Sequence, residues 1–358
     1  MFTNLLRFTW LGLATLSFAF SAQASEQWGV PLDQAATDEW QWVADENSFC
    51  RDGSPAGFFV RHGPDTTKLM IYLEGGGACF NDATCNINPS RIDGNHPPQE
   101  GILSHYNEGN PTKDWNMVYV PYCTGDLHAG NNENVWVSNG VQNQQFVGYR
   151  NLSNFLSRIT PSFDEVDQVL LTGVSAGAMG ALYNFDQVQT SFGDIPVDML
   201  SDSGVAQSDR YLATCLQRRW RNLWNLDSTL PFDCVDCTRE NGGGLSNIAT
   251  HIAEKFPDRN FAYYSTLQDQ VIRLFMGYGR NNCRVLVPFT SAGAHRAGLF
   301  EVRDQILKDT AVFYYIEGTF HTAIRGQAFY DVETHGVRLN NWVGDFIEGL
   351  GQSLGPHR

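Results

Sequence analysis

The sequence predicts an α/β fold in which helices cover a mostly parallel sheet. Apolar runs typical of buried strands recur along the chain, and stretches with helical spacing separate them. Segments rich in Asn, Gly and Cys predict long loops at 79–115, 123–140 and 225–247, which in this architecture usually cover the functional site. Because no internal repeat or Pro/Ser-rich linker interrupts the pattern, we expect residues 25–358 to form one domain.

The first 24 residues predict a secretory signal peptide. Arg7 precedes an apolar run from Phe8 to Phe20. Ala22 and Ala24 then supply the small residues that a signal peptidase reads. The run is shorter than the roughly 20 residues that a membrane-spanning helix needs. Cleavage after Ala24 would leave a secreted or periplasmic protein without stable membrane insertion.

All eight cysteines follow the predicted cleavage site, and their even number in an oxidising compartment indicates structural disulfides. The residues leave the pairing open. Cys234 and Cys237 have C-x-x-C spacing, but neither a second ligand pair nor a strand-to-helix setting accompanies them, so we expect no metal there. The cysteines are Cys50, Cys79, Cys85, Cys123, Cys215, Cys234, Cys237 and Cys283.

The formal net charge of −15 argues against nucleic acid as a partner. Phosphate backbones are bound by clusters of Lys and Arg, and this sequence has none. The same charge weakens the attraction of a polyanionic substrate at low salt. Asp126 and His128 are too few to indicate a metal site. The aromatic residues around Trp136, Trp220 and Trp224 fit either sugar stacking or, more commonly, a core.

Six apolar runs predict the strands of the sheet, at 68–74, 116–122, 166–172, 196–200, 261–267 and 311–316. Apolar residues at helical spacing predict a helix over 141–159, and Pro161 should end it. Further helices are expected at 178–185, 293–307 and 341–350.

The strongest local signal is Gly173-Val-Ser175-Ala-Gly177, which lies where a predicted strand turns into a helix. A serine at such a turn is the nucleophile of an α/β-hydrolase, because the strained backbone exposes its hydroxyl and the two glycines let strand and helix pack closely. Ala176 opens the helix, so its N–H can donate to a developing oxyanion. A chance match in a glycine-rich chain is the alternative, and the flanking strand and helix argue against it.

A glycine triplet, Gly75 to Gly77, follows the predicted strand 68–74 and precedes Ala78. Such a run brings backbone N–H groups close to an acyl oxygen, which makes Gly76, Gly77 and Ala78 candidates for the rest of the oxyanion hole. A phosphate loop would require Gly-Lys-Ser/Thr after the glycines, and that motif is absent.

A nucleophilic serine needs a base, and in this fold the acid and the base follow it in the order Asp/Glu, then His. His321 has the best setting, because it lies in the loop after the last predicted strand. His335 is the main alternative, whereas His295 lies in a predicted helix and His357 in the tail.

Asp269 follows the strand predicted at 261–267 and is the expected acid, which would orient the imidazole of His321. Asp202, after an earlier strand, is the competitor. Its other expected role is to cap a following helix.

With these residues assembled, the sequence resembles the pectin acetylesterase and Notum carboxylesterase family. The matching segments occur in the family's order over most of the chain. They are Tyr72-Leu-Glu-Gly-Gly-Gly-Ala-Cys79, Gly173-Val-Ser-Ala-Gly177, Asp202-Ser-Gly204, Ser265-Thr-Leu-Gln-Asp269 and His321-Thr322. One departure is Ala78, where the family usually carries Trp, so the acyl site should be more open or reshaped.

The resemblance implies an α/β-hydrolase domain without a cofactor, a triad of Ser175, His321 and Asp269, and a disulfide between Cys79 and Cys85. It also implies hydrolysis of small acyl groups, acetyl above all, from a larger alcohol such as pectin, by way of an acyl-enzyme. A lipase-like or polyester-depolymerising esterase is the alternative, followed by a non-catalytic homologue that binds a glycan or lipid.

Overall fold

The computed structural model describes residues 29–32, 38–92, 97–284 and 289–357 of the 358-residue chain. The predicted signal peptide, residues 1–24, lies outside the described residues. No helix in the described ranges is long and apolar enough to cross a bilayer.

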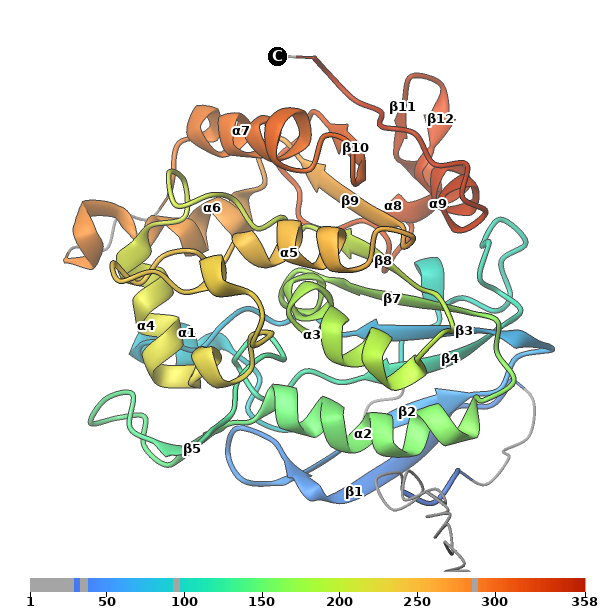
Figure 1. Cartoon of the computed structure of the whole chain (residues 1–358), viewed down its shortest axis with the longest axis horizontal. Coiled ribbons are helices and arrows are strands. Elements are labelled where there is room, and N and C mark those ends of the chain that lie inside the picture. Colours follow the sequence, from blue (N-terminus) through green and yellow to red (C-terminus); the bar gives the residue numbers. More distant parts are fainter. Residues whose placement is uncertain (1–28, 33–37, 93–96, 285–288, 358) are drawn as a thin grey trace, which may run out of the picture.

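Eight of the described strands form one sheet in the order β1-β2-β4-β3-β7-β8-β9-β10 (Figure 1). The pairs β1–β2 and β2–β4 are antiparallel, and all later neighbours in this order are parallel. This arrangement confirms the predicted α/β-hydrolase fold. The strands are β1 (Gln41–Phe49), β2 (Pro55–Arg61), β3 (Asp65–Leu73), β4 (Trp115–Val120), β7 (Gln168–Val174), β8 (Val197–Asp202), β9 (Phe261–Thr266) and β10 (Val312–Ile316).

Alternating side chains divide the core between two apolar clusters, one on each face of the sheet. On β7, Val169 and Leu171 belong to one cluster, whereas Leu170 and Val174 belong to the other. Helices therefore cover both faces, as a buried parallel sheet requires. The first cluster includes residues of α2 (Gly148–Ser162), α3 (Ala176–Phe192) and α5 (Asn247–Lys255), and the second those of α8 (Ala328–Asp331) and α9 (Leu339–Ile347).

The six predicted strands are all present, as β3, β4, β7, β8, β9 and β10. Strands β1 and β2 were not predicted. In β1 only Val43 and Ser48 are buried, so an edge strand with mostly polar, exposed residues carries no apolar run to detect.

The helix predicted over 141–159 instead begins at Gly148, because residues 144–146 form a strand that pairs with 132–135. Pro161 does not end it either, since α2 continues to Ser162. Proline lacks the N–H that would bond to the carbonyl of Ser157. The N–H of Gly29 occupies that carbonyl instead, at 2.8 Å, so the last turn is retained.

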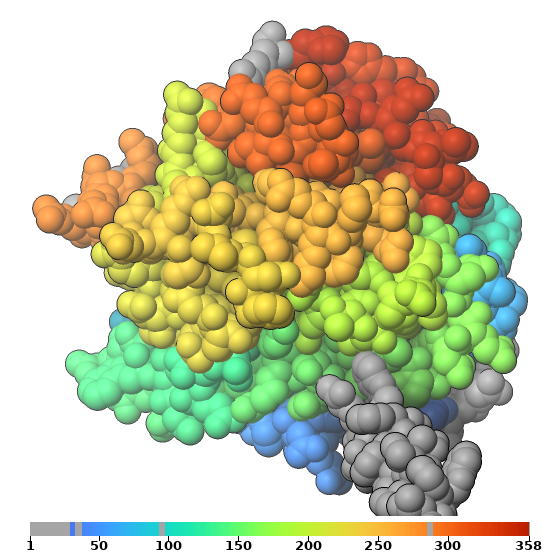
Figure 2. All heavy atoms as spheres, viewed as in Figure 1, coloured from blue at the N-terminus to red at the C-terminus, as the bar shows by residue number. Residues whose placement is uncertain are grey.

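The three other predicted helices are present, and the one at 178–185 is part of α3. The helices predicted at 293–307 and 341–350 are confirmed as α7 with the turn after it and as α9. Figure 2 shows the yellow segments around α4 and the orange segments after them forming a continuous surface on one face. The other elements are α1 (Asp82–Ile87), α4 (Thr214–Trp224), α6 (Gln270–Gly277), α7 (Ala292–Glu301), β5 (Asn132–Val135), β6 (Gln144–Phe146), β11 (Glu333–Thr334), β12 (Val337–Arg338), and the short turns η1 (Gly101–Leu103), η2 (Leu226–Ser228), η3 (Val235–Cys237), η4 (Arg280–Cys283) and η5 (Val302–Ile306).

All eight cysteines form disulfides, which confirms the prediction from their number. The pair Cys79–Cys85 is the one that the family resemblance implies, and Cys234 and Cys237 bond to each other. The other two bonds join segments far apart in the sequence. They are Cys50–Cys123 and Cys215–Cys283.

Candidate active site

Ser175 occupies a sharp turn between the end of β7 and the start of α3. Its φ of 56° and ψ of −117° lie in a region that non-glycine residues rarely adopt. A Cβ at Gly177 would lie 1.9 Å from the carbonyl oxygen of Leu73 on β3, so only glycine lets the helix approach the sheet so closely. The expected nucleophile is therefore held on a strained, tightly packed turn.

Asp269 and His321 are brought together from the ends of β9 and β10. The Oδ2 atom of Asp269 lies 2.7 Å from Nδ1 of His321. The other carboxylate oxygen, Oδ1, accepts the N–H groups of Val271 and Ile272 at 2.9 and 3.0 Å and so caps α6. Because the Asp269 side chain is fully buried, the cap leaves Oδ2 directed at the imidazole.

Ser175 and His321 line the same open cleft, which has a volume of about 330 Å³. The Nε2 atom of His321 has no hydrogen-bond partner within the described part of the chain. Ser175 and His321 are not hydrogen-bonded to each other there, which is common in hydrolase sites without substrate. Among the described residues, the Nε2 atom is therefore unpartnered in a residue that lines the same cleft as Ser175.

The glycine loop borders the same cleft and is held by its carbonyl groups. Asn88 donates to the carbonyl of Gly76 at 2.6 Å, and the hydroxyl of Tyr122 donates to that of Gly77 at 2.9 Å. In a trans peptide the carbonyl of one residue and the N–H of the next point in opposite directions. The two bonds therefore fix the directions of the Gly77 and Ala78 N–H groups.

Of the four predicted oxyanion-hole residues, Gly77, Ala78 and Ala176 share a second cavity with Ser175, whereas Gly76 lines only the open cleft. Ala176 is the first residue of α3, so its N–H has no partner inside the helix. Sequence reasoning did not identify Asn88 and Tyr122, because an amide inside a long loop and a phenol at the end of a predicted strand match no motif.

The loop that carries His321 is tied to the sheet on both sides. Before His321, the hydroxyl of Thr266 on β9 donates to the carbonyl of Phe320 at 2.7 Å. After it, Asp202 at the end of β8 accepts the N–H groups of Ala323 and Ile324 at 2.7 and 2.8 Å. Burial raises the pKa of Asp202 to about 6.

Asp202, the competing candidate for the acid, therefore contacts the backbone after His321 and not its ring nitrogen. The expectation that it caps a following helix is wrong, because the next helix, α4, begins only at Thr214. The contact of Asp202 with the backbone after His321 could not be predicted from the sequence, since 121 residues separate Asp202 from Ala323.

The other histidine candidates lie in different settings. His295 is buried in α7, where its Nδ1 lies 3.1 Å from Nε2 of Gln207, and burial lowers its pKa to about 4. His335 lies in the turn between β11 and β12 and contacts the carbonyl of Gly355. His357 lies at the end of the described chain.

Asp126 and His128 have structural partners. Asp126 accepts the hydroxyl of Thr124 at 2.6 Å and the N–H of Gly148 at 2.8 Å. His128 Nε2 lies 2.8 Å from the carbonyl oxygen of Glu74, at the end of β3. These contacts attach the loop at 123–130 to α2 and to the strand before the glycine triplet.

An apolar cavity of about 70 Å³ lies beside Ser175. Its volume is several times the roughly 10–15 Å³ that one water molecule needs. Apart from Ser175 and the oxyanion-hole candidates, its wall is almost entirely apolar. It includes Leu127, Met179, Val205, Ala206, Leu212, Trp220, Ile272, Phe275 and Met276, with Gln207 as a polar exception.

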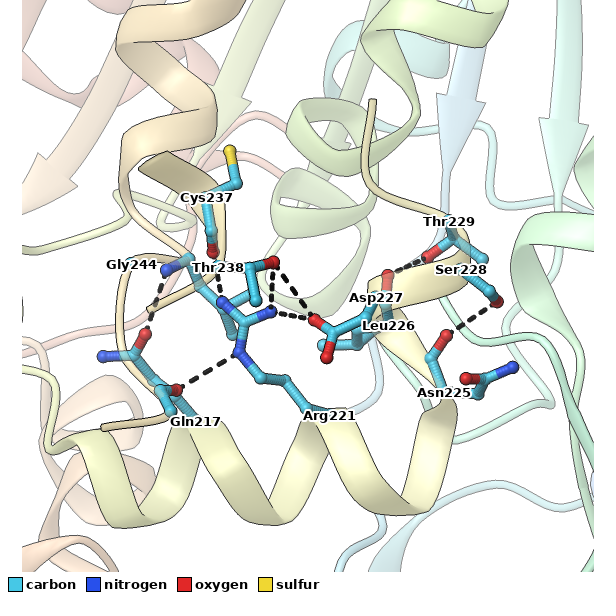
Figure 3. A network of polar contacts seen from close by, with 12 residues as sticks. Gln217, Arg221, Asn225, Leu226, Asp227, Ser228, Thr229, Cys237, Thr238 and Gly244 are labelled. Carbon is cyan, nitrogen blue, oxygen red and sulfur yellow. Dashed lines mark hydrogen bonds and ion pairs between the residues drawn. The ribbon is translucent and has the colours of Figure 1, made fainter. Parts of the chain in front are cut away.

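Helix α4 supplies part of this wall and is fixed by buried polar contacts. Trp220 and Trp224 stack with ring centres 5.5 Å apart, and Trp224 Nε1 donates to the carbonyl of Cys79 at 3.0 Å. Both rings are therefore core, whereas Trp136 is exposed. The guanidinium of Arg221 binds Asp227 and the carbonyl of Cys237 (Figure 3). These bonds hold the loop at 225–244 against α4.

A sheet of this order, with a serine on a positive-φ turn after β7, defines the α/β-hydrolase class. A family model described as Pectinacetylesterase matches residues 34–255. The chain belongs to this family of carboxylic ester hydrolases. The matched range contains Ser175 and the glycine triplet, whereas Asp269 and His321 lie beyond it.

Several palmitoleoyl-protein carboxylesterases are similar to the chain. The Xenopus laevis protein notum2 is 30% identical over 213 residues, which are 52% of this chain and 42% of that protein. The human protein NOTUM is 31% identical over 178 residues, 46% of this chain and 34% of that protein. The matched segments thus span less than half the length of these relatives.

The solved structure of the Wnt deacylase Notum from Drosophila has a similar fold. Its TM-score is 0.68 at 21% sequence identity, and the match covers 88% of this chain and 96% of that one. At this sequence identity the comparison shows that the two proteins share a fold.

Proposed function

We propose that the protein is a serine carboxylesterase in which Ser175, His321 and Asp269 act as nucleophile, base and acid. The observation that carries the proposal is the His321–Asp269 hydrogen bond at 2.7 Å, in which His321 keeps an Nε2 atom that is unpartnered within the described ranges and lines the same cleft as Ser175. Asp269 would keep the proton on Nδ1, which leaves Nε2 as the acceptor.

In the proposed reaction the hydroxyl oxygen of Ser175 attacks the acyl carbonyl while His321 takes its proton. The N–H groups of Gly77, Ala78 and Ala176 are the best-placed donors to the oxyanion, and Gly76 is the weakest of the predicted four. His321 then gives the proton to the leaving alcohol. A water molecule, activated by the same histidine, releases the acid from the acyl-enzyme.

The acyl group that we propose is small, with acetyl as the reference case. An apolar cavity beside Ser175 supports an apolar acyl group, because it would remove the chain from water without leaving a buried polar group unpaired. Ala78 helps to keep this cavity open, because Ala78 is buried and lines the cavity, so a larger side chain at that position would occupy part of its volume.

For the alcohol part we propose a larger, partly anionic molecule, such as an acetylated pectin. Arg325 supports this choice, because it lines the cleft with Ser175 and His321, is exposed, and has no ion-pair partner among the described residues. The nearby carboxylate of Glu74 instead accepts the N–H of Tyr122 at 3.0 Å. A local cation would offset the repulsion that the net charge of −15 imposes on a polyanion.

A longer-chain, lipase-like esterase is the second candidate. The cavity favours it, because about 70 Å³ exceeds the space that a single methyl group fills. The names of the palmitoleoyl-protein carboxylesterases point the same way.

We also propose that residues 1–24 direct export and that residues 25–358 act as one secreted or periplasmic domain. The four disulfides support an oxidising compartment.

The test is a chain-length series of aryl esters, run beside acetylated pectin and acetylated xylan, with wild type and Ser175→Ala. We expect hydrolysis by the wild type only. Unchanged hydrolysis by Ser175→Ala would refute the proposed nucleophile. Release of acetate from pectin supports the first candidate, whereas a peak at long acyl chains without acetate release from either glycan supports the second.

A further inference from the structure

Asp202 contacts both sides of the proposed catalytic machinery. Its backbone carbonyl accepts the N–H of Ser175 at 2.8 Å. Its side-chain Oδ2 accepts the N–H groups of Ala323 and Ile324 at 2.7 and 2.8 Å. One residue at the end of β8 thus links the turn of Ser175 to the loop that follows His321.

The backbone directly after His321 is strained. Thr322 has a φ of 61°, which is unfavourable for a β-branched residue and persists only where the surroundings hold it. The hydroxyl of Ser203 lies 3.3 Å from the N–H of Thr322 and donates to Oδ1 of Asp202 at 2.9 Å. Together, Asp202 and Ser203 bind the N–H groups of all three residues that follow His321.

The Asp202 side chain is fully buried, so its charge is costly unless hydrogen bonds compensate it. Two backbone N–H groups and one hydroxyl supply that compensation. In turn, a charged acceptor binds N–H groups more strongly than a neutral one. The carboxylate is thus suited to hold a strained turn that a neutral side chain would hold less firmly.

We infer that Asp202 is a positioning residue for His321: its buried carboxylate holds the strained turn at 322–324 and thereby sets the imidazole between Asp269 and Ser175. The catalytic part of this inference rests on the proposed function. The effect on the His321–Asp269 geometry does not depend on the proposed function.

The test compares Asp202→Ala and Asp202→Asn with the matched control Asp198→Ala. Asp198 is a buried aspartate at the other end of β8, and it too accepts a backbone N–H, from Asn260 at 2.9 Å. Active sites are counted by the burst of an aryl acetate, so that misfolded protein does not lower the measured kcat.

We expect Asp202→Ala to lower kcat about 10²-fold, the effect of displacing a reacting group by about 1 Å, with KM changed less than twofold. Asp202→Asn keeps an oxygen that can accept both N–H groups, so its kcat should be about tenfold higher than that of Asp202→Ala. Asp198→Ala should keep the wild-type kcat even where its stability falls. If Asp202→Ala does not fold, Ser203→Ala serves in its place, with an expected loss of about tenfold in kcat.

A second readout is independent of turnover. The proton in the His321–Asp269 hydrogen bond gives a downfield proton resonance, which is assigned by its loss in His321→Gln. We expect Asp202→Ala to shift or broaden this resonance and Asp198→Ala to leave it unchanged.

The inference would be overturned if Asp202→Ala showed the wild-type kcat and an unshifted resonance. If Asp202→Ala does not fold, the same result in both Ser203→Ala and Asp202→Asn would overturn it. If hydrolysis depends on Ser175 and Asp202→Ala changes neither readout, the inference alone fails. If the wild type hydrolyses no ester but the resonance responds to Asp202, the proposed function fails and the positioning role stands.

Discussion

The hydroxyl of Tyr122 lies 2.9 Å from the carbonyl oxygen of Gly77 and fixes the peptide that presents the N–H of Ala78. The same hydroxyl accepts the N–H of Leu127 at 2.8 Å. Leu127 lines the apolar cavity beside Ser175. A single phenol just after β4 therefore connects the proposed oxyanion hole to the proposed acyl site.

Replacing Tyr122 with phenylalanine should lower kcat about tenfold on an aryl acetate. Removing one oxyanion donor outright costs about 10²–10³ in rate, and Tyr122→Phe would only loosen one. Leaving the Leu127 N–H without a partner should also reduce the free energy of unfolding by about 1–3 kcal/mol. Steady-state kinetics and urea unfolding measure the two effects.

Tyr183→Phe is the matched control, because Tyr183 is a buried tyrosine whose hydroxyl has no partner among the described residues. It should keep the wild-type kcat. Equal losses in the two variants would contradict the role given to Tyr122.

Asp269→Asn should lower kcat by about 10⁴-fold while the protein stays folded. The amide oxygen can still accept the N–H groups that cap α6, which leaves the amide NH₂ facing Nδ1 of His321. A donor there forces the imidazole into the wrong tautomer. Single-turnover kinetics and circular dichroism check the prediction, and a loss below tenfold would show that Asp269 is not the acid.

Ala78→Trp should shift the preference towards short acyl chains. Its ring would enter the cavity beside Ser175, so hydrolysis of a hexanoate should fall at least tenfold more than hydrolysis of an acetate. Met179→Ala, on another part of the same wall, should enlarge the cavity and shift the preference the opposite way. A uniform change for all chain lengths would mean that the cavity does not bind the acyl group.

Arg325→Gln should lower kcat/KM several-fold for an acetylated, anionic galacturonan oligomer and leave a neutral aryl acetate unaffected. Salt should reduce the difference between the two proteins, because it screens an exposed charge. Arg219→Gln, an exposed arginine on α4 that does not line the cleft, is the control. Equal losses on the anionic and the neutral ester would argue against recognition of charge by Arg325.

The stability of the protein should respond to pH through Asp202. Burial raises its folded-state pKa from 3.8 to about 6, so the folded protein binds this proton more tightly than the unfolded chain does. The resulting stabilisation is complete below pH 3.8 and is lost as the pH rises through about 6.

Asp202→Asn cannot lose this proton. From pH 4 to pH 7 the difference in the free energy of unfolding should therefore move about 2 kcal/mol in favour of the variant. Urea unfolding of both proteins at the two pH values measures the change. A difference that is constant with pH would show that the pKa of Asp202 is not raised.

Much of the central sheet was predictable because its strands are buried on both faces and therefore appear as apolar runs. The run at 166–172 and the glycines around Ser175 sufficed to place β7 and the turn after it, since close packing of α3 against the sheet leaves room only for glycine. The edge strand β1 escaped prediction, because its side chains are mostly exposed and polar.

The candidate site was predictable where chain order constrains it. Ser175, Asp269 and His321 each follow a strand of the parallel sheet, and parallel strands end at the same edge, so their order in the sequence already indicated that they would meet. The supporting residues Asn88, Tyr122 and Asp202 were not predictable in these roles. Each binds a backbone group. Because nearly all residues have the same backbone groups, the sequence does not indicate which side chain will bind a given one.

The sequence alone thus determined the class of fold and indicated the residues that we propose for ester chemistry, because residue type and spacing constrain local backbone geometry and the order of strands. Only the tertiary structure decided that Asp269 faces the ring of His321 while Asp202 holds the turn after it. Both are buried aspartates at strand ends, and which one reaches the imidazole depends on the relative positions of β8, β9 and β10.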